Sequence, residues 1–217
     1  MATEIEIKRL LDADGYAQLR ARLDALATPH IHEQVNHYLD LTDAALNEAG
    51  AMLRLRVVGE RMVLTLKARA SVEGGILRTQ ELEHELTTPA DRLFWRTWPI
   101  AWREAAVWIS DWLQTTGLHA LTHRDGTLQE VGSTENLRLA YKLVDGIPGW
   151  PHPLTLELDM TRFPGGVVRW ELECEDPESE ALVPFLAAWL TSFGVNTVAA
   201  TETKYAQFLR LAARPSH

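Results

Sequence analysis

The N-terminal segment Glu4-Ile5-Glu6-Ile7-Lys8 alternates charged and apolar side chains. Successive side chains of a β-strand point to opposite faces, so a strand here would place Glu4, Glu6 and Lys8 on one face. Carboxylates are the hard oxygen ligands that Mg²⁺ and Mn²⁺ prefer, and a lysine ammonium attracts phosphate. A strand of this kind could therefore help to bind a divalent cation together with an anion.

The same alternation recurs in further predicted strands along the chain, each with one apolar face and one charged face. In chain order, the charged faces carry Glu4, Glu6, Lys8, Arg54, Arg56, Lys67, Glu81, Glu83, Glu85, Arg138, Glu157, Asp159, Glu171 and Glu173. The opposite faces carry mostly leucine and isoleucine. Solvated sheet faces usually mix in neutral polar residues, whereas these faces are acidic on some strands and basic on others.

Two architectures satisfy this pattern. The charged faces could be the solvated side of an open sheet whose apolar side is covered by helices. Alternatively, about eight strands close into a barrel with an apolar outer surface and a hydrated, ion-binding interior, because dry unpaired charges would cost too much free energy. Repetition across the strands favours the barrel. We predict an α+β fold: a closed antiparallel eight-stranded β-barrel with a charged lumen and helices packed outside.

The middle of the chain changes character and predicts a Trp-rich helical insertion at about residues 88–117. Pro89 and Pro99 suit helix starts, and Gly117 suits a C-terminal cap. One helical stripe contains Trp98, Trp102, Ala105, Ile109 and Trp112. Such a stripe is more typical of a core or a partner interface than of a ligand site. We treat the chain, residues 1–217, as a single domain with this insertion between strands.

Composition limits the partners. The 217 residues carry a formal net charge of −9, which argues against a nucleic acid or an anionic membrane held by a broad basic surface. Cys174 is the only cysteine, and neither a signal segment nor a bilayer-spanning apolar run is evident. We therefore expect a cytoplasmic protein with a small-molecule partner. The sequence does not fix the oligomeric state, and a homodimer stays among the alternatives.

"EIEIK" resembles the ExExK signature of the CYTH superfamily, the triphosphate tunnel metalloenzymes. The resemblance runs through nearly the whole chain, and eight motifs in the right order are far more specific than one. After "EIEIK", the matching segments are "HYLDLTDAALNEAGAMLRLR", "LTLKA", "ELEHEL", "ENLRLAYKL", "LELD", "WELECE" and "TKYAQFL". The end of the chain, with "FPGG", "WELECE" and "TKYAQFL", is most similar to the short tripolyphosphatase-like members. Class IV adenylyl cyclases and thiamine-triphosphatases are related to them.

The resemblance implies roles for particular residues. Metal ligands would be Glu4, Glu6, Asp159, Glu171 and Glu173. Triphosphate would be held by Lys8, Arg54, Arg56, Lys67, Arg138 and Lys204. Catalysis would depend on Lys8, Lys204 and Asp159, which is either a ligand or the group that orients the attacking water. The acidic-strand motif matches Glu81, Glu83 and Glu85 but does not say which of them face the tunnel. Tyr38 and Asp40 match a motif whose role could be a structural hydrogen bond or a substrate contact.

The function implied is that of a divalent-metal-dependent hydrolase that cleaves a phosphoanhydride bond of inorganic triphosphate with Mg²⁺ or Mn²⁺. Nucleoside or thiamine triphosphatase activity is an alternative, and so is class IV adenylyl cyclase activity, although no distinct adenine-recognition motif is visible. A non-enzymatic sensor of polyphosphate or nucleotides is a further alternative. A sensor would need the basic residues but not the four carboxylates Glu4, Glu6, Glu171 and Glu173, whose presence favours an enzyme.

Overall fold

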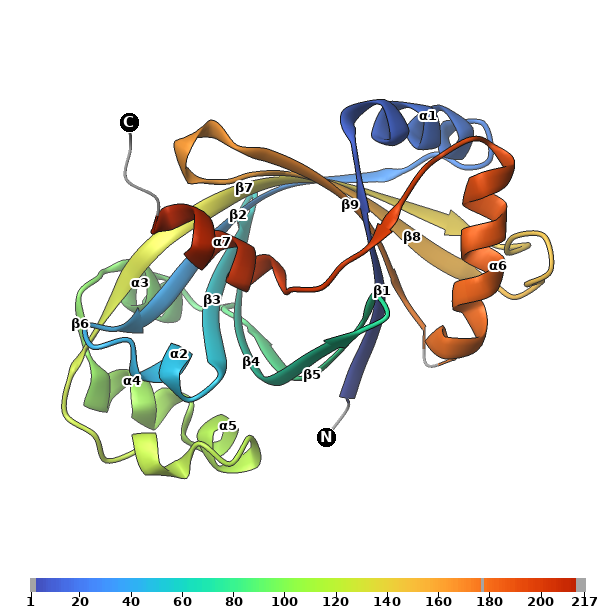
Figure 1. The fold of residues 1–217 in the computed structure, drawn as a ribbon. Coiled ribbons are helices and arrows are strands. Elements are labelled where there is room, and N and C mark those ends of the chain that lie inside the picture. The colour runs from blue at the N-terminus through green and yellow to red at the C-terminus, as the bar shows by residue number, and fades with distance from the viewer. Residues whose placement is uncertain (1–2, 177, 214–217) are drawn as a thin grey trace. The chain divides into compact units, whose positions relative to one another are not determined.

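The computed structural model describes residues 3–176 and 178–213 (Figure 1). Its chain divides into two compact units, each assembled from segments that are distant in sequence. Unit 1 contains residues 34–70 and 79–134 together with Thr3. Unit 2 contains residues 4–33, 71–78 and the chain from residue 135 onward.

The described strands form one ten-stranded sheet with the order β10-β1-β5-β4-β3-β2-β7-β8-β9, and β6 pairs with β7. The order returns to its start because β1 also pairs with β9. Apart from the two-residue strands β6 and β10, this is a closed antiparallel eight-stranded β-barrel. The α+β barrel predicted from the sequence is thus confirmed. The strands are β1 (Thr3–Leu11), β2 (His30–Leu41), β3 (Ala51–Val58), β4 (Arg61–Glu73), β5 (Ile76–Glu85), β6 (Ile100–Ala101), β7 (Thr127–Leu143), β8 (Leu154–Arg162), β9 (Val168–Glu175) and β10 (Val198–Ala199).

Unit 2 has its own hydrophobic core, built where helices cover the apolar faces of β8 and β9. Leu158 and Leu172 are register partners on these two strands, and both are fully buried. Helix α6 (Ser179–Ser192) contributes Leu182 and Leu186 to the same core, and Figure 1 shows α6 beside β8. Helix α1 (Ala13–Asp24) adds further leucines to this core and begins at Asp12, whose side chain accepts a hydrogen bond from the Gly15 amide at 2.7 Å.

Cys174 belongs to this core as well. It lies on β9, and its side chain is fully buried among the apolar residues. Burial, together with nearby carboxylates beginning with Asp176, raises the pKa of the Cys174 thiol to about 12. The thiol is therefore protonated and unreactive at neutral pH in the folded protein.

Unit 1 contains the β3–β4 hairpin and the Trp-rich region. Gly59, with φ of +57°, lies in the two-residue turn between these strands, and an L residue adopts this conformation less readily than glycine. Leu53 and Leu66 are register partners with fully buried side chains. The core also includes Trp95 and Trp102, which are both fully buried. The small helix α2 (Ala45–Glu48) connects β2 to β3.

The Trp-rich region contains three helices, but not in the arrangement that the stripe suggested. They are α3 (Pro89–Arg96), α4 (Trp102–Trp108) and α5 (Ser110–Thr115). The expectation that a helix starts at Pro99 is wrong, because Ile100 and Ala101 pair with β7 in the extended strand β6. A second break falls at Ile109, whose backbone angles of −110° and 21° depart from helical values. The stripe therefore marks residues that face one core, rather than one continuous helix.

The last helix, α7 (Lys204–Ala212), belongs to unit 2 and begins at Thr203, whose hydroxyl accepts a hydrogen bond from the Ala206 amide at 3.1 Å. No helix within residues 3–176 or 178–213 combines the length and the apolar character needed to span a bilayer.

Candidate active site

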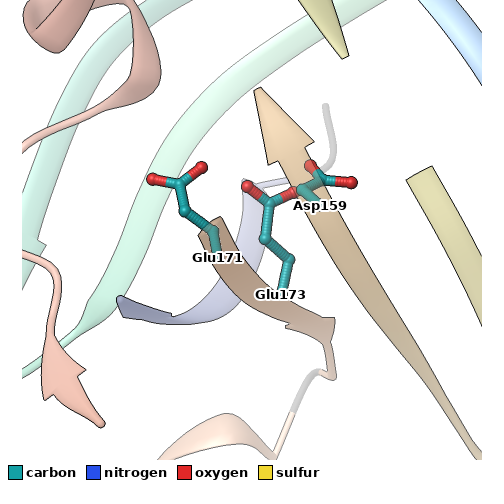
Figure 2. Close-up of side chains that lie close together, drawn as sticks. All are labelled: Asp159, Glu171 and Glu173. Carbon is teal, nitrogen blue, oxygen red and sulfur yellow. The ribbon is translucent and has the colours of Figure 1, made fainter. Parts of the chain in front are cut away.

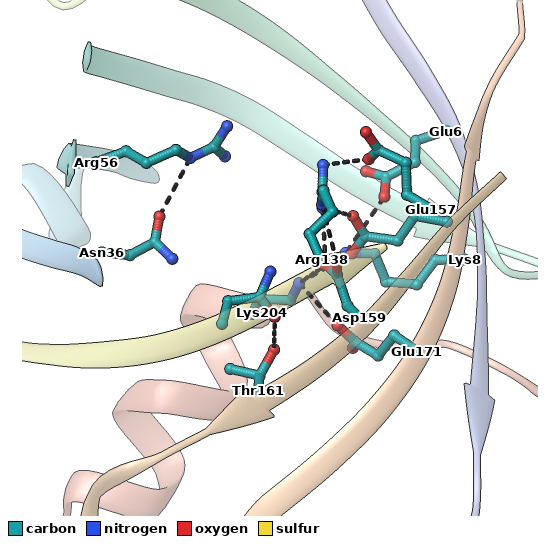
Figure 3. Close-up of polar contacts among 12 residues, drawn as sticks. Glu6, Lys8, Asn36, Arg56, Arg138, Glu157, Asp159, Thr161, Glu171 and Lys204 are labelled. Atoms are coloured by element: carbon teal, nitrogen blue, oxygen red, sulfur yellow. Dashed lines mark hydrogen bonds and ion pairs between the residues drawn. The ribbon is translucent and has the colours of Figure 1, made fainter. Parts of the chain in front are cut away.

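Unit 2 gathers eight charged side chains into one group, which we call the acidic cluster. Its members come from β1, β7, β8, β9 and α7 and are Glu6, Lys8, Arg138, Glu157, Asp159, Glu171, Glu173 and Lys204 (Figure 3). Five carboxylates and three cations leave the cluster with two formal negative charges in excess. A local excess of negative charge is what a divalent cation requires.

Strand register brings these residues together. Lys8 on β1 lies opposite Glu173 on β9, and Arg138 on β7 lies opposite Asp159 on β8. Asp159 in turn lies opposite Glu171 on β9. Because directly opposed residues of an antiparallel pair project to the same face, the alternation in each strand becomes one continuous charged surface.

Cations contact both oxygens of the Asp159 carboxylate. The Arg138 guanidinium donates to it twice, from Nε to Oδ1 at 2.8 Å and from Nη2 to Oδ2 at 2.7 Å. The Lys204 ammonium lies 2.6 Å from the same Oδ2. The Asp159 side chain is fully buried, so these two cations take the place of water as its partners.

Lysine side chains connect the remaining carboxylates. Lys8 Nζ lies 2.6 Å from Glu173 Oε1 and 3.5 Å from Glu6 Oε1. Lys204 Nζ lies 3.1 Å from Glu171 Oε2 and 3.1 Å from Glu173 Oε1. Arg138 also forms ion pairs with Glu157 and Glu173.

The pKa values follow from this pairing. Burial opposes ionisation of Asp159, but Arg138 and Lys204 outweigh it and lower the pKa of Asp159. Burial also opposes ionisation of Glu173, but Lys204, Lys8 and Arg138 hold its pKa well below the usual range. Burial likewise opposes the charged form of Lys8, yet the carboxylates led by Glu173 raise its pKa well above its ordinary value. Glu157 differs, because burial raises its pKa and Arg138 offsets only part of that effect. Asp159, Glu173 and Lys8 are therefore charged at neutral pH.

Three carboxylates are placed to hold a metal ion. Asp159, Glu171 and Glu173 offer oxygen atoms that all lie within 4.8 Å of one another, and all three residues are buried (Figure 2). Figure 2 shows Glu171 and Glu173 side by side on β9, with Asp159 on the neighbouring strand β8. An all-oxygen, all-carboxylate donor set suits a hard cation such as Mg²⁺ or Mn²⁺. Glu4 and Glu6, also predicted as ligands, lie on β1 outside this group of three.

Unit 1 carries a second charged group, which we call the basic cluster: Arg54, Arg56, Lys67, Glu81 and Glu83. Arg54 Nη2 lies 3.7 Å from Glu81 and 3.5 Å from Glu83, and Lys67 Nζ lies 2.8 Å from Glu81. Arg56 donates from Nε to the Asn36 side-chain oxygen at 3.3 Å, as Figure 3 shows. Three cations and two carboxylates leave one formal positive charge in excess.

The structure separates the three glutamates of the acidic strand β5. Glu81 and Glu83 join the basic cluster, and Glu83 also accepts a hydrogen bond from Thr65 at 2.8 Å. Glu85 instead pairs with Arg61 at 2.8 Å, and both side chains are well exposed. Alternation alone could not distinguish these residues, because all three share the same face.

Asp40 has a structural environment. Its side chain is buried and accepts hydrogen bonds from the backbone amides of Leu41, Leu46 and Asn47 at 2.7, 2.9 and 3.1 Å. These bonds hold the connection from β2 through α2 to β3. Burial raises the pKa of Asp40, although the three amides counteract it. A structural hydrogen bond, one of the two roles left open for this residue, is therefore observed.

Three polar residues in unit 2 were not predicted from the sequence. Gln207 on α7 is buried and donates from Nε2 to Glu171 Oε1 at 2.9 Å. Asn136 and Thr161 share a buried hydrogen bond of 2.7 Å between β7 and β8. Neutral polar side chains carry no charge pattern by which a strand-face comparison could have found them.

Comparison with known families agrees with this architecture. Residues 2–196 match the model of the CYTH domain, and the chain therefore belongs to the CYTH domain family.

Individual relatives are described as triphosphatases or adenylyl cyclases. The solved structure of HpAC1 from Hippeastrum, a candidate adenylyl cyclase described as having a dominant triphosphatase activity, superposes with a TM-score of 0.80 and 25% identity, covering 98% of each chain. A candidate adenylate cyclase from Bacillus halodurans shares the fold, with a TM-score of 0.64, 22% identity and coverage of 96% of this chain and 99% of the other. The candidate triphosphatase YjbK of Bacillus subtilis is 34% identical over 84 residues, which span 39% of this chain and 43% of that relative. The chain is thus related to triphosphatase and adenylyl cyclase-like proteins.

Proposed function

We propose that this protein is a divalent-metal-dependent triphosphatase that hydrolyses a phosphoanhydride bond of inorganic triphosphate. One observation carries the proposal: buried carboxylates suited to a cation belong to the same cluster as Lys8, Arg138 and Lys204, which could contact phosphate. A highly charged anion needs both kinds of group, because its charge must be neutralised as the leaving phosphate departs.

Asp159, Glu171 and Glu173 would hold the metal ion, with Glu6 and Glu4 contributing from β1. Bound Mg²⁺ or Mn²⁺ would polarise phosphoryl oxygens and offset charge on the leaving diphosphate. The chemistry of the three donors fits these ions, while the choice between them is part of the proposal.

The cations of the acidic cluster would position the triphosphate. Lys8 and Lys204 supply point charges, and Arg138 supplies a planar guanidinium able to contact two phosphate oxygens. In unit 1, Arg54, Arg56 and Lys67 are proposed from the resemblance of their motifs to bind triphosphate. Their cluster has an excess of positive charge, as anion binding requires.

In the proposed reaction a water oxygen bonds to the terminal phosphorus while the bond from that phosphorus to the bridging oxygen breaks. Diphosphate leaves and one water proton is released. Asp159 is a weak base, since its pKa is lowered and both of its oxygens already contact cations. We therefore assign it to metal binding and orientation rather than to taking the water proton.

Adenylyl cyclase activity is the second candidate, supported by the similarity to HpAC1, itself a candidate adenylyl cyclase. The two reactions differ in the bond broken: a cyclase cleaves ATP between the α and β phosphates and releases cyclic AMP and pyrophosphate. Nucleoside or thiamine triphosphatase activity would keep the hydrolysis and change only the organic part of the substrate.

One assay separates these functions. Phosphate release is measured from triphosphate, ATP and thiamine triphosphate with Mg²⁺ or Mn²⁺, and cyclic AMP and pyrophosphate are measured in the ATP reaction. We expect triphosphate to be the best substrate. Cyclic AMP with pyrophosphate in place of phosphate would establish the cyclase, and tight binding of triphosphate without turnover would establish a sensor.

The proposed setting is a reducing compartment such as the cytoplasm, which suits a chain whose single cysteine is a buried thiol. The proposed partner is a small triphosphate-containing molecule and not a nucleic acid, given the net charge of −9.

A further inference from the structure

Gln207 lies one helical turn after Lys204 on α7, and both residues reach the same carboxylate. The Gln207 side chain is buried, with 3% of its surface exposed, and its Nε2 donates to Glu171 Oε1 at 2.9 Å. Glu171 is itself fully buried. The contact is therefore an interior hydrogen bond between two side chains that water does not reach.

The two oxygens of Glu171 have different partners. Oε1 is held by Gln207, whereas Oε2 lies 3.1 Å from Lys204 Nζ. That same ammonium lies 2.6 Å from Asp159 Oδ2 and 3.1 Å from Glu173 Oε1. Glu171 Oε2 thus shares the Lys204 ammonium with Asp159 and Glu173. Glu171 Oε1 is fixed by Gln207 on α7.

This division has a physical consequence, because the terminal torsion of a glutamate has broad, shallow preferences. A donor bonded to one oxygen fixes the plane of the carboxylate and hence the direction in which the other oxygen points. An amide does so without adding positive charge.

We infer that Gln207 is a positioning residue that orients Glu171 for metal binding. The inference rests on the proposed function for the identity of the bound cation as a divalent metal. It predicts that loss of the amide weakens metal binding rather than the binding of triphosphate.

The test is calorimetric titration of Mn²⁺ into wild type and Gln207→Met, without substrate. Methionine has nearly the length of glutamine but cannot donate a hydrogen bond. We expect Mn²⁺ affinity to fall by roughly 10- to 100-fold, the usual range for residues that orient a ligand. In steady-state assays at saturating Mn²⁺, we expect KM for triphosphate to stay within about twofold of the wild-type value.

Leu211→Ala is the matched control, because Leu211 is buried on the same helix and Leu211→Ala leaves the amide in place. It should lower the melting temperature without changing Mn²⁺ affinity. The inference is overturned if Gln207→Met titrates like wild type, or if Leu211→Ala weakens Mn²⁺ binding equally.

If Gln207→Met does not fold, Gln207→Asn decides the question. It keeps the amide but is one methylene shorter, so it should also bind Mn²⁺ more weakly, and wild-type affinity in this variant would refute the role. The titrations contain no substrate, so they judge Gln207 even if the wild-type protein releases no phosphate from triphosphate. That result would overturn only the proposed function.

Discussion

The acidic cluster of unit 2 and the basic cluster of unit 1 use the same residue types to opposite effect. In the acidic cluster, Lys8 and Lys204 lie 2.6 Å from buried carboxylates that outnumber the cations. In the basic cluster, cations outnumber carboxylates, and the contacts of Arg54 are longer, from 3.3 to 3.7 Å. Glu83 there has 43% of its side chain exposed, whereas Asp159 has none. The first cluster is suited to a cation and the second to an anion.

The sharpest test of this contrast is to remove a carboxylate from the acidic cluster. Glu171→Gln should lower turnover roughly a thousandfold, equivalent to about 4 kcal/mol, because it removes a charged ligand from the proposed metal site. Chelation of the metal should abolish turnover in wild type. Phosphate release at saturating Mg²⁺ measures the effect of Glu171→Gln, and phosphate release with the chelator in excess over the metal measures the effect of chelation.

Glu85→Gln is the control for that change, since Glu85 pairs with the exposed Arg61 outside both clusters. It should keep the wild-type rate. If Glu171→Gln kept it as well, the assignment of the acidic cluster to metal binding would be wrong.

Removing one cation from each cluster compares how much a buried and a more exposed cation contribute to the free energy of unfolding. Lys8→Met should cost about 3 kcal/mol of unfolding free energy, because it leaves Glu173 and Glu6 as buried carboxylates without that cation. Lys67→Met should cost at most about 1 kcal/mol, because its ion pair is more exposed. Urea denaturation without metal measures both, and equal losses would remove the distinction between the clusters.

Triphosphate affinity tests the basic cluster directly. Arg56→Ala should weaken binding by about 1.5 to 3 kcal/mol, which is roughly tenfold or more in Kd, because it deletes a hydrogen-bond donor to a charged ligand. Metal affinity should not change. Arg61→Ala, on the same hairpin but paired with the exposed Glu85, is the control. Calorimetry that finds equal affinities in all three proteins would exclude Arg56 from the substrate site.

The smallest predicted effect is on the pH dependence of the free energy of unfolding, to which buried acids with different partners contribute differently. The pKa of Asp40 is raised by burial, whereas cations lower the pKa values of Asp159 and Glu173. An acid with a raised folded-state pKa contributes stability below its unfolded pKa of about 3.9 and loses it as the pH rises through the folded value. Wild type should therefore lose stability relative to Asp40→Asn as the pH rises from about 4 toward neutrality. Urea denaturation across that range measures the difference, and the opposite slope would contradict the assignment.

The barrel was predictable because strand alternation identifies which residues share a face without knowledge of their neighbours. Lys8 and Glu173 appear on charged faces in the sequence, and register places them opposite each other. Alternation cannot separate Glu83 from Glu85, because the difference lies in their side-chain partners, Arg54 for Glu83 and Arg61 for Glu85. The resemblance to the CYTH motifs, which occur in the right order, identified the candidate site residues. The role of each of these residues stays a prediction.

Other features depended on competition between neighbouring segments. Ile100 and Ala101 could have joined a helix by spacing alone, yet they hydrogen-bond to β7 instead. Gln207 gave no signal, since its importance lies in a contact with Glu171 that is 36 residues distant in sequence. That the whole chain acts as a single domain also stays a prediction.

The buried thiol of Cys174 can report how often β9 opens in the folded protein. It sits between Glu173 and Glu175 on β9, the strand that carries Glu171 and Glu173, and it is sealed from solvent. A thiol reagent can react only when this strand opens, so the labelling rate under native conditions counts opening events. A cation bound by Glu171 and Glu173 should lower the labelling rate of Cys174. This natural cysteine thus makes it possible to follow the occupancy of the site without substrate, dye or engineered probe.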